Sequence, residues 1–271
     1  MDTLSPQLFA IFASLIEDTC GLHYDVQDRE LFGAKLSAHA MEHGHDSLLD
    51  YYYRLRYDDP GRVELQLLVE SLLVHETYFF RELPPLVQLV DTHLAPTIRQ
   101  YGRARVWSAA CATGEEPYSL AMLLDSRGLL DDVEIVATDI SSAAIERARA
   151  GRHGRRSLRD GHPPDLARRY LEVTPPGLSV ARRIRDAVRF STLNLVLPNA
   201  GAELGLFDAI LCRNVLIYFK DDQVVRVIDK LTDRLGANGL LAVGVSESLL
   251  RFGTRLACEE RGNTFFYRRA R

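Results

Sequence analysis

Two short stretches of the sequence combine residue types that could bind a charged ligand. Residues 107–118 read W-S-A-A-C-A-T-G-E-E-P-Y, with the single glycine Gly114 followed by Glu115 and Glu116. Residues 74–82 read V-H-E-T-Y-F-F-R-E and supply Arg81. Turns that bind pyrophosphate are rich in glycine, because their backbone N–H groups must converge on anionic oxygens. Two adjacent carboxylates would repel a phosphate, so the first stretch is suited to a cationic or hydroxyl-rich ligand.

A third candidate, Asp139, ends the apolar run V-E-I-V-A-T-D about 25 residues after Gly114. In nucleotide-binding sheets an acidic residue at this place accepts hydrogen bonds from the ribose hydroxyls. Taken alone, Asp139 could equally cap the helix that Ser141 is expected to begin. Together with the acidic turn it indicates a ligand with a ribose, no pyrophosphate and a positive charge. S-adenosylmethionine has these three properties.

The elements that must position these residues alternate between strands and helices. Strands are expected at residues 105–109, 133–138, 207–212, 240–245 and 263–267, and helices at 115–124, 141–150 and 223–235. Pro84 and Pro85 are well placed to begin another helix. The alternation predicts an α/β fold with a parallel, doubly wound sheet, in which ligands bind beyond the carboxyl ends of the strands. Ala109 and Gly114, in the first turn of this kind, are therefore candidate ligand contacts.

The beginning of the chain has a different character. Apolar residues recur at helical spacing in 4–16, 28–41, 48–55 and 63–74, with Ser47 as a capping residue, and no strand pattern precedes residue 100. Residues 1–80 contain fourteen Asp and Glu against five Lys and Arg, whereas residues 81–271 contain 23 against 28. These differences predict an all-α N-terminal domain over 1–80 and a second domain over 81–271. Residues 170–192 read as short antiparallel strands, which predicts a small β insertion at about 168–192.

The predicted insertion lies in an arginine-rich part of the chain, which holds nine arginines between Arg152 and Arg185. Such a run is either a solvated face or a docking surface for an acidic partner. Nucleic acid is disfavoured, because no aromatic residues are interleaved with the arginines and the net charge is −4.

Other compositional features exclude several classes of protein. The four cysteines are scattered without paired spacing, which argues against a disulfide framework and against a metal site. The N-terminus lacks the pattern of a signal peptide, and no apolar run approaches the ~20 residues of a membrane span. A cytoplasmic protein that is not embedded in a membrane is expected.

With the motifs S-T-L-N-L at 191–195 and C-R-N-V-L-I-Y-F at 212–219, the sequence resembles the CheR family of chemoreceptor glutamate O-methyltransferases. The resemblance spans the chain. It implies a Rossmann-like methyltransferase domain with a small antiparallel β insertion, preceded by an all-α domain. It also implies methylation of glutamate side chains on the cytoplasmic helices of methyl-accepting chemotaxis receptors, with S-adenosylmethionine converted to S-adenosylhomocysteine. A monomer is the simplest expectation.

The resemblance also implies site residues. Cofactor contacts are expected at His75, Thr77, Arg81, Ala109, Gly114, Glu116, Asp139, Asn194, Leu195, Asn214 and Val215. Arg81 would pair with the methionine carboxylate or steer the incoming glutamate, and Tyr218 would orient the substrate carboxylate. Glu116 would meet the ammonium end of the cofactor.

The sequence departs from the family pattern at two places. His75 stands where the family usually has asparagine, and it could be a mere helix-end residue. The helix expected at 28–41 carries only Arg29 and Lys35, where the family has a basic helix that faces the receptor. This departure leaves open whether that helix docks the receptor, and the arginines of the insertion could compensate.

Three other functions remain compatible with parts of the pattern: methylation of a different substrate, such as a small carboxylate or a non-receptor protein, binding of the cofactor or its product without catalysis, and nucleic-acid methylation. Esterification of a glutamate requires no general base, because a carboxyl with a pKa near ~4.3 is already ionised at neutral pH. The absence of a hydrolase-type triad is therefore uninformative.

Phe79 and Phe80 could line an apolar pocket, but core packing is the alternative for at least one of them.

Overall fold

The computed structural model describes residues 4–175 and 177–270, which form two compact units. The first contains the described chain up to Val74 together with Tyr218–Gln223, and the second contains His75–Ile217 and the chain from Val224 onward. The domain boundary predicted after residue 80 lies six residues beyond this division. Residues 75–80 belong to the second unit because Phe79 N donates to Ser157 O (2.7 Å) and Phe80 N donates to Ser119 Oγ (2.8 Å).

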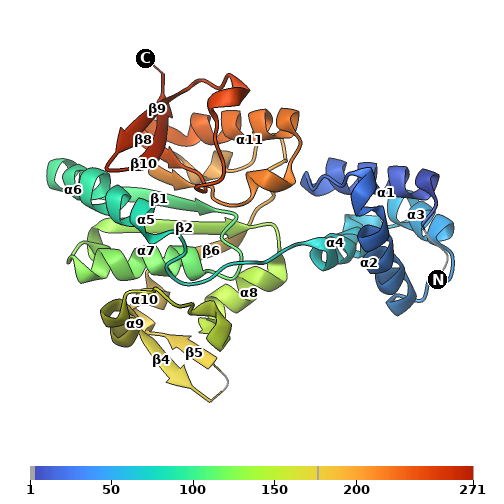
Figure 1. Ribbon diagram of the computed structural model, residues 1–271, viewed down its shortest axis with the longest axis horizontal. Coiled ribbons are helices and arrows are strands. Elements are labelled where there is room, and N and C mark those ends of the chain that lie inside the picture. The colour runs from blue at the N-terminus through green and yellow to red at the C-terminus, as the bar shows by residue number, and fades with distance from the viewer. Residues whose placement is uncertain (1–3, 176, 271) are drawn as a thin grey trace. The chain divides into compact units, whose positions relative to one another are not determined.

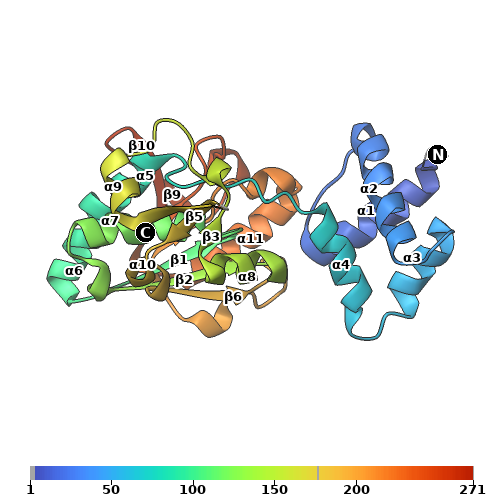
Figure 2. The same cartoon turned by 90° about the horizontal axis from the view of Figure 1, so that it is seen from below.

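Four helices build the first unit (Figure 2): α1 (Pro6–Cys20), α2 (Arg29–Glu42), α3 (Leu48–Tyr57) and α4 (Val63–Leu72). Local signals fix their ends. Ser47 Oγ accepts a hydrogen bond from Asp50 N at 3.3 Å, as expected of a capping serine, and Gly21 ends α1 in the left-handed conformation. Phe12, Leu36 and Leu65 are fully buried at the centre. No strand occurs among the described residues before Ala104.

A seven-stranded sheet forms the centre of the second unit (Figure 1). Its order is β6-β2-β1-β7-β8-β10-β9, from β6 (Val188–Thr192), β2 (Val133–Asp139), β1 (Ala104–Ala109), β7 (Phe207–Leu211), β8 (Leu235–Ala242), β10 (Thr264–Arg269) and β9 (Leu256–Arg261). The first five strands are parallel. Strand β10 pairs antiparallel with both β8 and β9, so the sheet is mostly parallel, in agreement with the predicted doubly wound fold, and β9 was not predicted.

The middle strand, β1, shows why these sequences form a buried parallel sheet. Val106 lies opposite Ile135 on one side and Ala209 on the other, and neither Val106 nor Trp107 is exposed. Strands covered on both faces read as apolar runs rather than as alternating patterns. The helices of this unit include α5 (Leu83–Leu89), α6 (Ala95–Tyr101), α7 (Glu115–Ser126), α8 (Ser142–Ala150) and most of α11 (Asp221–Arg234), with a π-helical turn at Val90–Leu94.

A second, three-stranded antiparallel sheet has the order β3-β5-β4, from β3 (Arg152–His153), β5 (Gly177–Val180) and β4 (Leu171–Thr174). Figure 1 shows β4 and β5 below α9 (Pro164–Tyr170) and α10 (Arg182–Asp186). The predicted insertion at about 168–192 therefore begins later along the chain than the observed one, which includes β3, and it ends later, because it includes β6. Its last predicted strand is β6, which pairs in parallel with β2 because its apolar residues, such as Phe190 opposite Ala137, complete the central sheet.

Within the described residues, no helix combines the length and the apolar character that crossing a membrane requires. No group of three or more histidine, cysteine, aspartate or glutamate side chains is arranged to hold a metal ion in 4–175 or 177–270.

Candidate active site

Polar residues gather where the five parallel strands end. Parallel strands bring their carboxyl ends to one edge of the sheet, and ligands of doubly wound folds bind there. The residues that follow β1, β2, β6, β7 and β8 at this edge include Glu116, Asp139, Asn194, Arg213, Asn214 and Glu247. The segment that precedes α5 joins them through Arg81 and Glu82.

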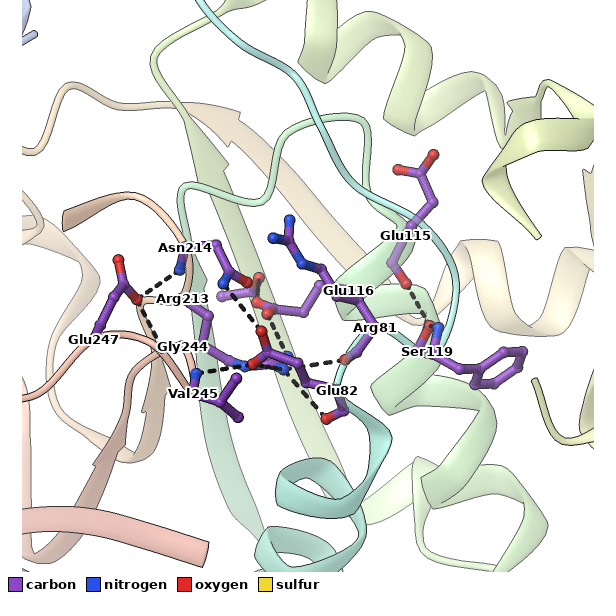
Figure 3. A network of polar contacts seen from close by, with 12 residues as sticks. Arg81, Glu82, Glu115, Glu116, Ser119, Arg213, Asn214, Gly244, Val245 and Glu247 are labelled. Carbon is purple, nitrogen blue, oxygen red and sulfur yellow. Dashed lines mark hydrogen bonds and ion pairs between the residues drawn. The ribbon is translucent and has the colours of Figure 1, made fainter. Parts of the chain in front are cut away.

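The guanidinium of Arg213 is the centre of the network (Figure 3). Its side chain is 1% exposed, and Nη1 lies 2.9 Å from Glu116 Oε2 while Nη2 lies 2.9 Å from Glu82 Oε2. Nη2 also donates to the backbone carbonyls of Arg81 (3.1 Å) and Glu82 (3.2 Å). One buried cation therefore joins the first turn of α7, the end of β7 and the segment that carries Arg81.

Glu82 is held ionised by this arrangement. Burial disfavours its charged form, but the charge of Arg213 and hydrogen bonds from Asn214 Nδ2 and Val245 N outweigh burial and lower its pKa. Breaking the Arg213 contact would leave a buried carboxylate without its cation.

Glu247 organises the loop after β7. One of its oxygens accepts from the backbone N–H groups of Asn214 and Gly244 (both 2.7 Å), and the other accepts from Leu216 N (2.8 Å) and Ile217 N (3.3 Å). Gly244 is required at this approach, because a Cβ there would lie 2.6 Å from Asn214 Nδ2 and 2.8 Å from Glu247 Oε2. The carboxylate thus fixes a loop in which Asn214 adopts φ 59°.

The turn after β1 is fixed by Asp139. Its Oδ2 accepts from Ala112 N (2.8 Å) and its Oδ1 from Ser141 N (2.9 Å), so it also takes the alternative role of ordering the start of α8. Gly114 (φ 94°) allows close packing, because a Cβ would lie 2.9 Å from Ala148 Cβ.

Backbone strain concentrates at this edge. Among the described residues, seven that are not glycine have positive φ, and five of them lie here: Phe80, Glu82, Ala110, Ala112 and Asn214. Each such residue costs on the order of 1–3 kcal/mol, and strained residues cluster at functional sites. Phe80 and Glu82, on either side of Arg81, form a kink in the chain. The Ser119 hydroxyl accepts from Phe80 N at one end, and Arg213 donates to the Arg81 and Glu82 carbonyls at the other. Arg81 is therefore presented by a rigid, strained turn.

The two adjacent glutamates have different roles. Glu116 remains in the network, with Oε1 accepting from Ser108 Oγ at 2.7 Å. The Glu115 carboxylate points away from Arg213 (Figure 3) and contacts His153 Nδ1 (3.1 Å) and Ser157 Oγ (2.9 Å). The interpretation of Glu115 as a ligand-facing carboxylate is therefore wrong.

The contacts of Glu115 set its ionisation. Burial opposes its charge, but the hydrogen bond and charge of His153 and the hydroxyl of Thr113 prevail and lower its pKa. Glu115 thus holds the first turn of α7 to the segment that follows β3.

The other predicted residues have the following surroundings. Arg81 Nη1 donates to Glu76 O (2.7 Å), and its side chain is directed away from the Arg213 guanidinium (Figure 3). His75 Nε2 is buried without a hydrogen-bond partner among the described residues. Asn194 Oδ1 accepts from Val196 N (3.1 Å), just after β6. Thr77 and Val215 are partly buried and Leu195 is buried, while Phe79 and Phe80 both pack in the core.

Tyr218 groups with the first unit rather than with this edge. Its backbone carbonyl accepts a hydrogen bond from His23 N at 2.9 Å. Its catalytic role stays a prediction.

Four members of the network were not predicted from the sequence: Glu82, Arg213, Glu247 and Ser108. A signal existed for two of them, since Arg213 directly follows the apolar strand F-D-A-I-L-C, and Glu247 comes soon after the strand L-L-A-V. A charged residue at the carboxyl end of a buried strand is a site candidate in this fold.

The charges at this edge favour a cationic ligand over a phosphate. Four carboxylates (Glu82, Glu116, Asp139 and Glu247) lie at this edge, and the buried arginine there, Arg213, is already shared between two of them. A pyrophosphate would meet uncompensated negative charge here, whereas a ligand with a sulfonium and an ammonium would not. The residues present therefore fit S-adenosylmethionine.

Comparison with known proteins agrees with this geometry. Residues 75–263 match the family described as "CheR methyltransferase, SAM binding domain". The chain is 34% identical over 250 residues to chemotaxis protein methyltransferase 1 of Pseudomonas aeruginosa, covering 89% of this chain and 90% of that protein. It is 35% identical over 221 residues to the chemotaxis protein methyltransferase of Escherichia coli, covering 80% and 75%. The chain therefore belongs to the CheR family of S-adenosylmethionine-dependent methyltransferases.

Proposed function

We propose that this enzyme esterifies glutamate side chains on the cytoplasmic helices of methyl-accepting chemoreceptors, acting as a monomer. The observation that carries the proposal is the carboxylate-rich edge of the sheet, joined through Arg213 to a strained turn that presents Arg81. Family membership and the chemotaxis methyltransferases among its relatives support the choice of substrate.

The residues divide between two tasks. Asp139 would accept hydrogen bonds from the ribose hydroxyls, and Glu116 would face the ammonium group, with Asn194, Leu195, Asn214 and Val215 beside the adenine. When bound, S-adenosylmethionine would supply a methyl group on a sulfonium, which a glutamate carboxylate oxygen could accept, with S-adenosylhomocysteine as the leaving group.

Arg81 and Tyr218 would serve the acceptor side. The glutamate is ionised at neutral pH, so no residue needs to remove a proton. The protein's contribution is then orientation of the carboxylate and exclusion of water, which in well-placed systems lowers barriers by ~7–11 kcal/mol. Arg81 would steer the glutamate or pair with the methionine carboxylate, and Tyr218 would orient the glutamate through its hydroxyl.

The test is transfer of tritiated methyl groups from S-adenosylmethionine to a purified chemoreceptor, followed by treatment with base. Wild-type enzyme should give a base-labile product, as expected of a methyl ester, and Arg81→Ala should lose most activity while keeping the wild-type thermal unfolding midpoint. Base-stable methylation would contradict the ester. Wild-type rates in Arg81→Ala would remove Arg81 from the mechanism.

A further inference from the structure

The arginines of the basic stretch are not equivalent in the structure. Five of the nine contact carboxylates at 4 Å or less: Arg159 with Glu76, Arg168 with Asp165, Arg169 with Asp125, Arg182 with Asp186, and Arg183 with Asp125 and Asp131. These pairs neutralise much of the charge on α9 and α10. Much of the arginine-rich stretch is therefore a solvated surface whose positive charges are already paired with carboxylates.

Among the described residues the other four make no such ion pair, and one of them, Arg185, is partly buried. Arg152, Arg155 and Arg156 are exposed, and within 4–175 and 177–270 their side chains have no ion-pair or hydrogen-bond partner. Residues 151–159 contain four arginines and no acidic residue. Arg152, Arg155 and Arg156 form what we call the free arginine patch.

The free arginine patch is held close to the candidate active site. Ser157, at the end of the 3₁₀ turn Arg155–Ser157, bonds through its hydroxyl to Glu115, the neighbour of Glu116. The Ser157 carbonyl accepts from Phe79 N at 2.7 Å, two residues before Arg81. Arg159 continues this contact, because its guanidinium lies 4.1 Å from the centre of the Tyr78 ring. The patch is thus attached both to the cofactor side and to the Arg81 segment.

Unpaired guanidinium groups beside a reaction centre attract anionic surfaces. Charged rims accelerate association by steering the partner, and this contribution weakens as salt screens it. A protein segment that carries methyl-accepting glutamates brings its own carboxylates to the site. Its charge is opposite to that of the free arginine patch.

We propose that the free arginine patch docks the acidic surface of the methyl-accepting protein next to the glutamate that is modified. This inference rests on the proposed function, because the docked partner is the substrate of the same site. It assigns a role in substrate recognition to Arg155 and Arg156 in particular, since they are exposed on a turn whose last residue, Ser157, is bonded to both Glu115 and Phe79.

The test compares two charge reversals in the full-length chain. Arg155→Glu/Arg156→Glu alters the patch, and Arg168→Glu/Arg182→Glu makes the same change in net charge at exposed arginines that are already paired. A soluble cytoplasmic fragment of a chemoreceptor is the substrate, so that lipid cannot contribute. KM for the fragment, kcat and S-adenosylhomocysteine affinity are measured at about 0.05 M and about 0.5 M salt.

We expect the patch variant to raise KM by about tenfold or more at low salt, with kcat and S-adenosylhomocysteine affinity within about twofold of wild type. The difference should shrink at high salt, and the control variant should stay within about twofold in KM. An unchanged KM in the patch variant, or an equal rise in the control, would overturn the docking proposal.

Two further outcomes are distinguishable. If wild-type enzyme transfers no methyl group to the fragment, the proposed function fails, and the docking proposal fails with it. If the patch variant loses binding to vesicles of anionic phospholipid or to duplex DNA while its KM is unchanged, the patch serves that other surface and the docking proposal alone is refuted.

Discussion

Replacing Arg213 by methionine is expected to destabilise the second unit strongly. The substitution removes a guanidinium that is 1% exposed and contacts two carboxylates and two backbone carbonyls. The partly buried carboxylates of Glu82 and Glu116 would then lose this counter-charge, and the two carbonyls would lose their donor. The strained turn that presents Arg81 would also lose one of its two fixed points.

The size of the effect follows from the burial of the ion pairs. Removing one partner of a buried pair costs ~3–5 kcal/mol, since an uncompensated charge remains. In a unit of this size each kcal/mol corresponds to about 2–4 °C in the unfolding midpoint, so a decrease of roughly 6–20 °C is expected. Arg213→Lys should lose less stability because it keeps the charge, but it should still lose activity, since an ammonium lacks the planar fork that reaches both carboxylates.

The assay is thermal unfolding followed by circular dichroism, with methyl transfer measured on folded protein well below the midpoint. Arg182→Met is the matched control, because Arg182 is 85% exposed and its ion pair within the described residues is with Asp186, a contact worth at most ~1 kcal/mol. A midpoint for Arg213→Met within about 2 °C of wild type would refute the view that Arg213 holds the site together.

Two other substitutions test separate parts of the site. Glu115→Gln should make the stability of the protein depend less on pH in acid. The pKa of Glu115 is lowered in the folded state, so the stability that its carboxylate contributes is present above about pH 4.3. That contribution is lost as the pH falls through the lowered pKa. Unfolding midpoints between about pH 3 and pH 7 measure this, and parallel curves for variant and wild type would contradict it. Gly244→Ala should cost ~1–3 kcal/mol and weaken cofactor binding, because the new methyl group would displace Asn214 and Glu247. Wild-type stability and affinity in that variant would show that the loop tolerates the methyl group.

The sequence predicted those features that depend on local chemistry. Ser47 and Ser141 begin helices by accepting backbone N–H groups, as their residue type indicates. The apolar runs of β1, β2 and β7 identified the central strands, because buried parallel strands have little polar content. The site edge and its acidic turn followed from the same order of elements.

Features that depend on partners far along the chain were not predictable in this way. Strand β9 reads L-A-C-E-E-R, which lacks the alternation of apolar and polar residues that indicates a strand, and its structure depends on pairing with β10. Strand β6 has a pattern that fits either sheet, and its register with β2 decides between them. Glu115 and Glu116 are adjacent in sequence, yet the rotation of α7 directs one to His153 and the other to Arg213.

Calorimetric titration with S-adenosylhomocysteine tests the central claim most directly. If the strand ends hold a sulfonium nucleoside as proposed, wild-type protein should bind one molecule per chain, and Asp139→Ala should bind more weakly because the ribose loses its acceptor. Binding of a dinucleotide at the same site, or no binding of S-adenosylhomocysteine at saturating concentration, would contradict the assignment of this acidic edge as the cofactor site.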